Sequence, residues 1–337
     1  MTDFITLEDW LQKACAGDAA RQAAGETLLK LAQAARETSR MVARGPMDDV
    51  VAGVSRQERP AKFDEKAGEL FMSALKGAPV AAIARERGML LEGSAGAPVA
   101  LAIDVLNGVQ NIMANIPTGS FFSFLPAAED DAFAQPGSAQ VCGGFFMYGP
   151  RTMLVFSFGE GTVVANMDPE TGVFHITSED RRLPREAARE YAANASNYRF
   201  WDSAIRTYVN DMIDGADGPR EADYNMRWAS SLPAETVRIL NRGGIFLYPG
   251  DSRPGHRHGR MRLLFHAFPV ALVVEQAGGM ATDGEQRILD KVPQARDQRT
   301  PLIFGSPSEV ERVRRYYELP VGGSRSPLFS RRGLFRF

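Results

Sequence analysis

The chain has 337 residues, 44% of them hydrophobic and 24% charged, a composition typical of a globular protein with a substantial core. Lysine and arginine total 39 against 41 aspartate and glutamate, and a net charge of −2 argues against nucleic acid or an anionic membrane as a partner. Two cysteines form no disulfide framework, and the N-terminus lacks a signal-peptide profile. No apolar run reaches the roughly 18 residues of a membrane helix. We therefore predict a cytoplasmic protein.

The first half of the chain favours helices followed by buried strands. Apolar residues recur at helical spacing over 26–44 and 64–76, which predicts two amphipathic helices. The turn residues of 168–172 predict a hairpin. Short apolar runs predict strands at 80–83, 99–103, 119–125 and within 143–158.

In the second half, helices and strands alternate, which predicts an α/β layered architecture. The polar stretch 179–196 predicts a helix and the boundary between two lobes. The predicted domains are an N-terminal lobe 1–185, a C-terminal lobe 186–320 and a loosely held tail 321–337. Helices are expected at 231–243 and 269–276, strands at 245–248 and 302–304, and a capping box at Ser306 to Glu309 before a last helix.

Several long motifs then occur in one fixed order. They are Tyr148-Gly149-Pro150, Asp168-Pro169, the nine residues Asn241 to Pro249, Arg262-Leu263-Leu264, Glu275 to Thr282, and Pro301 to Ser306. This series resembles the class 1 fructose-1,6-bisphosphatase family, over about residues 6 to 318. The resemblance implies a layered α-β-α-β-α sandwich, usually a homotetramer. It also implies removal of the 1-phosphate of fructose 1,6-bisphosphate, in gluconeogenesis or the Calvin cycle, by water and two or three Mg²⁺ ions.

By this resemblance, the metals belong to the turn 104–111. Asp104 keeps the first carboxylate and Leu106 its carbonyl, whereas Asn107 stands where the family has a second aspartate. His266 replaces a later glutamate. Magnesium prefers carboxylate oxygens, while histidine suits manganese or zinc, so Mg²⁺ is implied by the family and Mn²⁺ is an alternative.

The resemblance assigns catalytic roles to three carboxylates: Glu86 as the base, Asp64 as an organiser of the water, and Asp104. Arg85 replaces a metal-binding glutamate. Val109 and Gln110 replace the serines that hold the 1-phosphate, which leaves only the Gly108 backbone to contact it. The four side-chain ligand positions of the family are all carboxylates, but here they are Arg85, Asp104, Asn107 and His266, with a summed charge of about zero. Since arginine stays protonated, we expect the metal site not to form as the family builds it.

The other end of the substrate site is better preserved. Asn194, Arg227, Tyr248 and Arg260 match the family's contacts to the 6-phosphate and the sugar, with Arg227 reaching the site of a neighbouring subunit. Arg260 replaces a lysine and keeps the charge. Nearby, Trp228 and Asn197 replace tyrosines. These residues predict a pocket for a sugar bisphosphate or monophosphate.

Each residue also has a structural alternative. Asp104 could cap a turn, Glu86 could belong to a solvated ion-pair cluster with neighbouring arginines, and His266 could be packed or hydrogen-bonded. Arg227 and Arg260 could be surface cations. His256 and His258 superficially resemble a metal tract, but an exposed loop explains them as well.

Three hypotheses of function follow. The first is a fructose-1,6-bisphosphatase with a remodelled, weak metal site. The second is an inactive relative that binds sugar phosphates or pairs with an active paralogue. The third is a phosphatase for another substrate or metal, with His266 binding Mn²⁺ or Zn²⁺.

Overall fold

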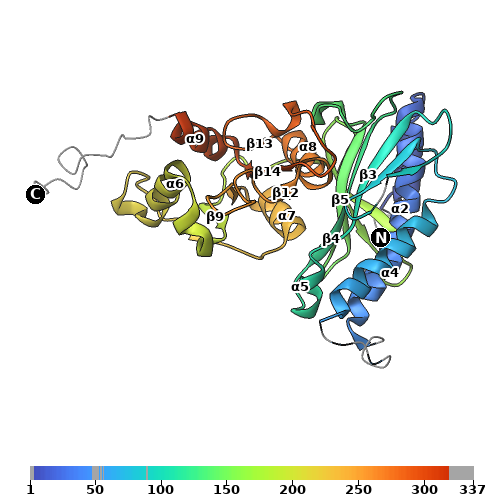
Figure 1. The fold of residues 1–337 in the computed structure, drawn as a ribbon, viewed down its shortest axis with the longest axis horizontal. Coiled ribbons are helices and arrows are strands. Elements are labelled where there is room, and N and C mark those ends of the chain that lie inside the picture. The colour runs from blue at the N-terminus through green and yellow to red at the C-terminus, as the bar shows by residue number, and fades with distance from the viewer. Residues whose placement is uncertain (1–3, 48–52, 54, 56, 89, 319–337) are drawn as a thin grey trace, which may run out of the picture.

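The structure, a computed structural model, describes residues 4–47, 53, 55, 57–88 and 90–318. Helices and two large sheets alternate in five layers, which confirms the predicted α-β-α-β-α sandwich (Figure 1). The predicted tail 321–337 lies outside the described residues. No helix in the described part of the chain is long and apolar enough to cross a membrane.

In the described part of the chain, the first two layers are a layer of helices and an eight-stranded sheet. The helices are α1 (Leu7–Ala14), α2 (Ala19–Arg44) and α4 (Arg59–Ala74). The strands are β1 (Ala82–Arg85), β2 (Leu90–Glu92), β3 (Val99–Asn107), β4 (Thr118–Pro126), β5 (Cys142–Tyr148), β6 (Met153–Ser157), β7 (Thr162–Met167) and β8 (Phe174–Arg181). They run in the order β2-β1-β3-β4-β5-β6-β7-β8, and among the named pairs only β1 and β3 are parallel. The helices cover one face, where Leu28 and Phe63 share a core with Phe122 and Phe146.

The remaining layers come from the second half of the chain. The second sheet has the order β10-β9-β11-β15-β13, from β9 (Glu190–Ala193), β10 (Asn225–Met226), β11 (Ile245–Tyr248), β13 (Met280–Thr282) and β15 (Leu302–Gly305). Helices α7 (Leu232–Arg242) and α8 (Phe268–Gln276) lie between the two sheets, and α6 (Ser203–Ile213) and α9 (Pro307–Glu318) cover the far face (Figure 1). Short strands β12 (Met261–Arg262) and β14 (Arg299–Thr300) form a separate pair. Since α7 and α8 pack on the first sheet, the division into two lobes near residue 185 stays a prediction.

Most predicted elements are present, with shifted boundaries. Helix α2 begins earlier than predicted because the Asp18 side chain accepts the Arg21 N–H and caps it. The predicted hairpin turn at 168–172 joins β7 to β8. Helix α7 begins after Ser231 and ends at Gly243, whose φ of 72° suits glycine.

Two local predictions are wrong. The stretch 179–196 holds no α-helix but the end of β8 and the buried strand β9; Glu190 is tolerated there because Arg238 and Arg242 bind its carboxylate. The helix after Ser306 exists, but the capping box does not form. Ser306 Oγ instead accepts the Gly244 N–H at 3.1 Å, and Glu309 binds elsewhere. Tertiary partners thus replace the local ones in both places.

Candidate functional site

The turn that carries the predicted metal residues lies at the end of β3. A register shift between Asp104 and Asn107 interrupts the pairing of β3 with β4, and Gly108 then takes a left-handed conformation with φ of 76°. Helix α5 (Val109–Met113) follows, with Val109 buried. Since valine has no hydroxyl, the position beside Gly108 offers no side-chain donor to a phosphate.

Asp104 is a buried carboxylate that accepts three hydrogen bonds from the chain itself. Its Oδ1 accepts the Leu106 N–H at 3.2 Å. Its Oδ2 accepts Asn107 Nδ2 at 3.0 Å and His266 Nε2 at 2.8 Å. Burial on its own would raise the pKa of Asp104, but these hydrogen bonds together hold that pKa below its ordinary value. The carboxylate is therefore charged and satisfied without a cation.

His266 lies in a π-helical turn, Leu263–Ala267, directly before α8. Its Nδ1 accepts the backbone N–H of Arg262 at 3.2 Å, so the proton sits on Nε2, which donates to Asp104. Phe121 packs against the ring edge-on, with the ring centroids 5.6 Å apart. Both ring nitrogens are engaged, and neither presents a free lone pair to a metal.

Glu86 and Asp64 are held by arginines. Glu86 Oε1 lies 3.2 Å from Arg262 Nε, and Oε2 lies 3.2 Å from Arg87 Nε. Arg87 also reaches Asp64 Oδ2 at 3.5 Å. Partial burial raises the pKa of Asp64, and Arg87 only partly offsets the rise.

Arg85 lies at the end of β1, beneath helix α4. A Cβ atom added to Gly68 would come within 2.6 Å of an Arg85 terminal nitrogen, so glycine makes room there for the guanidinium group. Arg85 Nε is buried and has no hydrogen-bond partner. A fixed cation thus lies close to the position where the resemblance expects a metal ligand.

The cluster of metal-site residues is electrically balanced by its own side chains. Three carboxylates (Asp64, Glu86, Asp104) lie among three guanidinium groups (Arg85, Arg87, Arg262). Within the described ranges, no three His, Cys, Asp or Glu side chains converge as metal ligands, and His256 faces only Asp251. The residues present do not fit a pair of divalent cations, because each carboxylate is already hydrogen-bonded or ion-paired.

A second set of predicted residues meets at the end of β11. Asn194, Tyr248 and Arg260 line one small pocket. Its cavity volume is about 10 Å³, room for about one water molecule, so a phosphate would have to move the exposed Arg260 side chain to enter. The other lining residues are Asn197, Trp201, Leu247, Pro249 and Asp251. We call this group of eight residues the sugar-phosphate pocket.

Tyr248 is held in place by ring stacking. The Trp228 ring lies parallel to the Tyr248 ring, at a centroid distance of 6.0 Å, and also stacks on Phe246. Neither the Tyr248 hydroxyl nor the Arg260 guanidinium has a polar partner among the residues the structure describes. Arg227 does not line this pocket; its Nε lies 3.8 Å from the Glu190 carboxylate.

Two residues of the candidate site were not expected from the sequence. Arg262 belongs to the motif Arg262-Leu263-Leu264. Its hydrogen bond to Glu86 forms because the fold brings this motif next to the end of β1, which is far away in the sequence. Asp251 accepts three hydrogen bonds from Arg253, two from its guanidinium group and one from its backbone N–H, which keep the pKa of Asp251 low. The available signal for Asp251 was a polar residue in the loop that follows β11.

The five-layer α-β-α-β-α sandwich is the architecture of the sugar phosphatases, and the two groups of candidate residues lie at the end of β3 and after β11. Two family models match the chain: fructose-1-6-bisphosphatase, N-terminal domain, at residues 9–179, and its C-terminal domain at residues 184–318. The chain therefore belongs to the class 1 fructose-1,6-bisphosphatase family of phosphoric monoester hydrolases, enzymes of carbohydrate metabolism.

Named relatives agree over almost the whole length. A fructose-1,6-bisphosphatase class 1 of Sinorhizobium medicae is 44% identical over 347 residues, covering 98% of this chain and 99% of the relative. One from Rhodopseudomonas palustris is 46% identical over 277 residues, or 81% of this chain and 80% of the relative. The crystal structure of Leishmania major fructose-1,6-bisphosphatase in holo form superposes with a TM-score of 0.84 at 25% identity, covering 94% of this chain and 100% of that one.

Proposed function

We propose that this chain binds fructose 1,6-bisphosphate and fructose 6-phosphate in the sugar-phosphate pocket, and that its hydrolysis of the 1-phosphate is slow or absent. The observation that carries this proposal is the balanced cluster at the metal end, where Glu86 lies between Arg87 and Arg262 and Asp104 is bound by His266. A family enzyme needs those carboxylates for its cations.

Binding rests mainly on Arg260 and Tyr248, whose polar groups form no hydrogen bond or ion pair with the residues that the structure describes. Arg260 offers a bidentate fork to the 6-phosphate, and the Tyr248 hydroxyl is available to a phosphate or sugar oxygen. Asn194 Oδ1 already accepts Ser196 Oγ at 2.5 Å, which fixes the amide and leaves its Nδ2 as a donor. Arg227, 56% exposed, would complete the site from a neighbouring subunit in a homo-oligomer, the tetramer of the family.

Slow hydrolysis of the 1-phosphate is expected because the charges at the metal end disfavour the binding of cations. A cation at Asp104 would have to displace the His266 proton donor, and a second cation near Glu86 would meet Arg85, Arg87 and Arg262. Two cations brought together without compensating carboxylates repel one another. Binding of Mg²⁺ or Mn²⁺ is therefore expected to be weak, and fructose 6-phosphate binding should not require either ion.

The test combines two measurements on the full-length protein. Phosphate release from fructose 1,6-bisphosphate is followed while Mg²⁺ and then Mn²⁺ are titrated, and fructose 6-phosphate binding is measured by calorimetry. We expect saturable binding and a rate at least about 10³-fold below the ordinary range of about 1–10³ per second. Turnover within that range, with either metal, would establish a working bisphosphatase and refute the slow-hydrolysis part. Absence of fructose 6-phosphate binding would refute the binding part.

We also propose that the protein resides in the cytoplasm. Cys15 and Cys142 are buried free thiols, as suits a reducing compartment. Burial raises the pKa of Cys15 to about 11, so this thiol is unreactive at neutral pH.

A further inference from the structure

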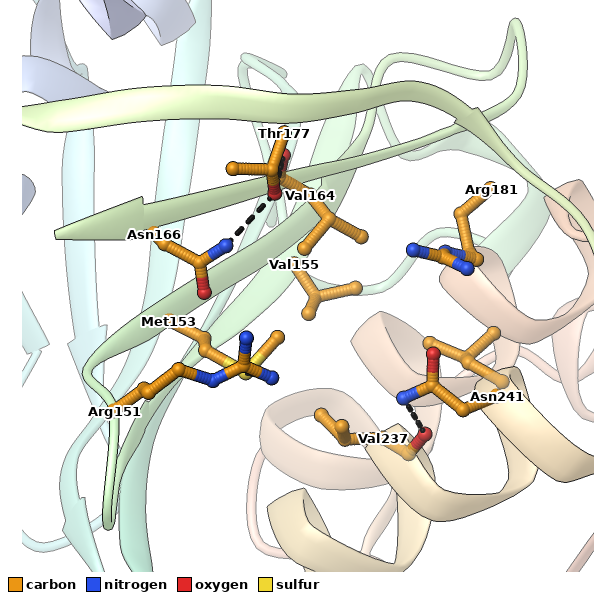
Figure 2. A pocket seen from close by; sticks show the side chains of 10 residues that line it. Arg151, Met153, Val155, Val164, Asn166, Thr177, Arg181, Val237 and Asn241 are labelled. Atoms are coloured by element: carbon orange, nitrogen blue, oxygen red, sulfur yellow. Dashed lines mark hydrogen bonds between the residues drawn. The ribbon is translucent and has the colours of Figure 1, made fainter.

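A larger cavity lies away from the sugar-phosphate pocket, between the first sheet and helix α7. Its volume is about 270 Å³, just below the range usual for small-ligand pockets. Its lining comes from β6, β7 and β8, the arginine before β6, and the second half of α7 (Figure 2). The residues are Arg151, Met153, Val155, Val164, Asn166, Thr177, Arg181, Val237, Leu240 and Asn241. We call this cavity the arginine pocket.

The arginine pocket is positively charged. Figure 2 shows the guanidinium groups of Arg151 and Arg181 directed toward it from different sides. Neither arginine forms an ion pair with any carboxylate in the described ranges; the nearest partner of Arg151 is the weak acceptor Met153 Sδ, at 3.9 Å. No aspartate or glutamate lines the cavity. Two uncompensated cations facing one cavity attract an anion.

The pocket also holds an unused hydrogen-bond acceptor. Asn166 Nδ2 donates to Thr177 Oγ1 at 2.9 Å, while Asn166 Oδ1 is buried without a partner. On the opposite wall, Asn241 Nδ2 donates to the Val237 carbonyl at 2.8 Å, which leaves its own Oδ1 facing the cavity (Figure 2). A buried acceptor without a donor is unfavourable, so a ligand hydroxyl that donates to it would be stabilised there.

We propose that the arginine pocket binds a small organic anion that carries phosphate or carboxylate groups and at least one hydroxyl. Arg151 and Arg181 bind the charged groups, and a ligand hydroxyl donates to Asn166 Oδ1. The buried side chains of Val155 and Val164 form an apolar floor for the carbon skeleton. No acid or base lines the cavity, so the site binds its ligand without chemistry.

The test is calorimetry on the full-length protein with citrate, 3-phosphoglycerate and inorganic phosphate as probes, and glycerol as the uncharged control. We expect at least one anion to bind with a Kd of about 1 mM or tighter, and glycerol not to bind. Preference for citrate assigns carboxylate recognition, and preference for a phosphate probe assigns phosphate recognition. No saturable binding of any anion would overturn the proposal.

Four variants test whether the anion binds in the arginine pocket. Arg151→Gln and Arg181→Gln should each weaken binding by about 10-fold to 100-fold. Val237→Phe fills the cavity without changing its charge and should abolish binding. Arg40→Gln removes an equal charge from α2, on the other face of the sheet, and should change nothing.

The sugar-phosphate pocket also attracts phosphate, so Arg260→Gln serves as the remaining control. The anion must still bind this variant with unchanged affinity. If Arg260→Gln abolishes binding while the two arginine variants do not, the anion occupies the sugar-phosphate pocket and the proposal is wrong. The arginine variants keep the test decisive even if Val237→Phe lowers the Tm, because both side chains lie on the rim of the cavity.

Discussion

The two ends of the substrate site differ in how their polar groups are satisfied. At the metal end, Asp104 accepts three hydrogen bonds from the chain, and Glu86 lies between two arginines. At the sugar-phosphate end, Arg260 and the Tyr248 hydroxyl have no polar partner within the part of the chain that the structure describes. The polar groups of one end are satisfied by internal bonds, whereas Arg260 and the Tyr248 hydroxyl at the other end are available to a ligand once Arg260 moves.

On the function we propose, this difference describes how the family's metal site changes while the fold is kept. Burying a carboxylate is costly unless it is paired, so replacing only the ligands around Asp104 would have left it exposed to that cost. His266 and Asn107 supply donors at the same positions, and the carboxylate stays satisfied. The proposed change at the metal end therefore needs no change in the surrounding sandwich.

The largest expected effect comes from restoring the acids. A variant with Arg85→Glu, Asn107→Asp and His266→Glu, together with Val109→Ser and Gln110→Ser, should hydrolyse fructose 1,6-bisphosphate at about 1 per second or faster with Mg²⁺. The gain over the unmodified chain should be at least about 10³-fold, because the ions gain carboxylate ligands and the phosphate gains hydroxyl donors. Phosphate release measures it.

The same variant carries its own control. Without a cation its new carboxylates crowd Asp104, so its Tm should be low and should rise as Mg²⁺ is added. A Tm that responds to Mg²⁺ without any turnover would mean that the metals bind but that hydrolysis is blocked elsewhere. A variant that neither binds Mg²⁺ nor gains activity would contradict our assignment of the ligand positions.

The next largest effect concerns the hydrogen bond from His266 to Asp104. His266→Ala should lower the free energy of unfolding by about 2–4 kcal/mol, since it removes a hydrogen bond to a buried carboxylate and leaves a cavity. Urea denaturation at pH 7 measures the loss. His258→Ala, in an exposed loop, is the matched control and should change the free energy by less than about 0.5 kcal/mol.

The pH dependence of this variant gives a second check. In the unmodified protein, the lowered pKa of Asp104 contributes stability above about pH 4, and that contribution is lost as the pH falls through the folded-state pKa. In His266→Ala, burial dominates and raises the pKa, so stability increases on acidification. The difference between the two proteins should therefore shrink as the pH falls. A difference that is constant with pH would show that His266 acts through packing alone.

A smaller effect is expected at the open end. Arg260→Gln should weaken fructose 6-phosphate binding by about 10-fold to 100-fold, because a charge-assisted bond to phosphate is lost. Arg257→Gln, an exposed arginine of the same loop, should leave the affinity within about twofold, as expected for a surface change. Equal losses in both variants would indicate general attraction by positive charge, and the sugar-phosphate pocket would then not be the binding site.

Local apolar patterns and caps predicted most individual helices and strands, as at Ser231 and Gly243 around α7, while the five-layer sandwich was predicted from the family resemblance. The same resemblance marked the positions where we expect changed metal ligands, and that assignment stays a prediction. The sequence did not predict that Arg262 would bind Glu86, because that contact joins residues 176 positions apart. Nor did it predict the arginine pocket, whose residues Arg151, Arg181 and Asn241 meet only when α7 packs on the sheet.

The smallest expected effect tests whether Asp64 still serves the metal end. Burial raises its pKa, so the folded state penalises the charged form, and the stability present below about pH 4 falls as the pH rises through the folded-state pKa. Asp64→Asn removes this penalty and should stabilise the protein by about 0.5–1 kcal/mol at pH 7, after allowance for the exposed Arg87 pair. Urea titrations at pH 7 and at about pH 4 measure this gain, which should vanish at the lower pH. If the variant is instead less stable at pH 7, Asp64 is held by Arg87 more strongly than it is penalised by burial. The metal end would then be a cooperative ion-pair network, more tightly closed than we infer.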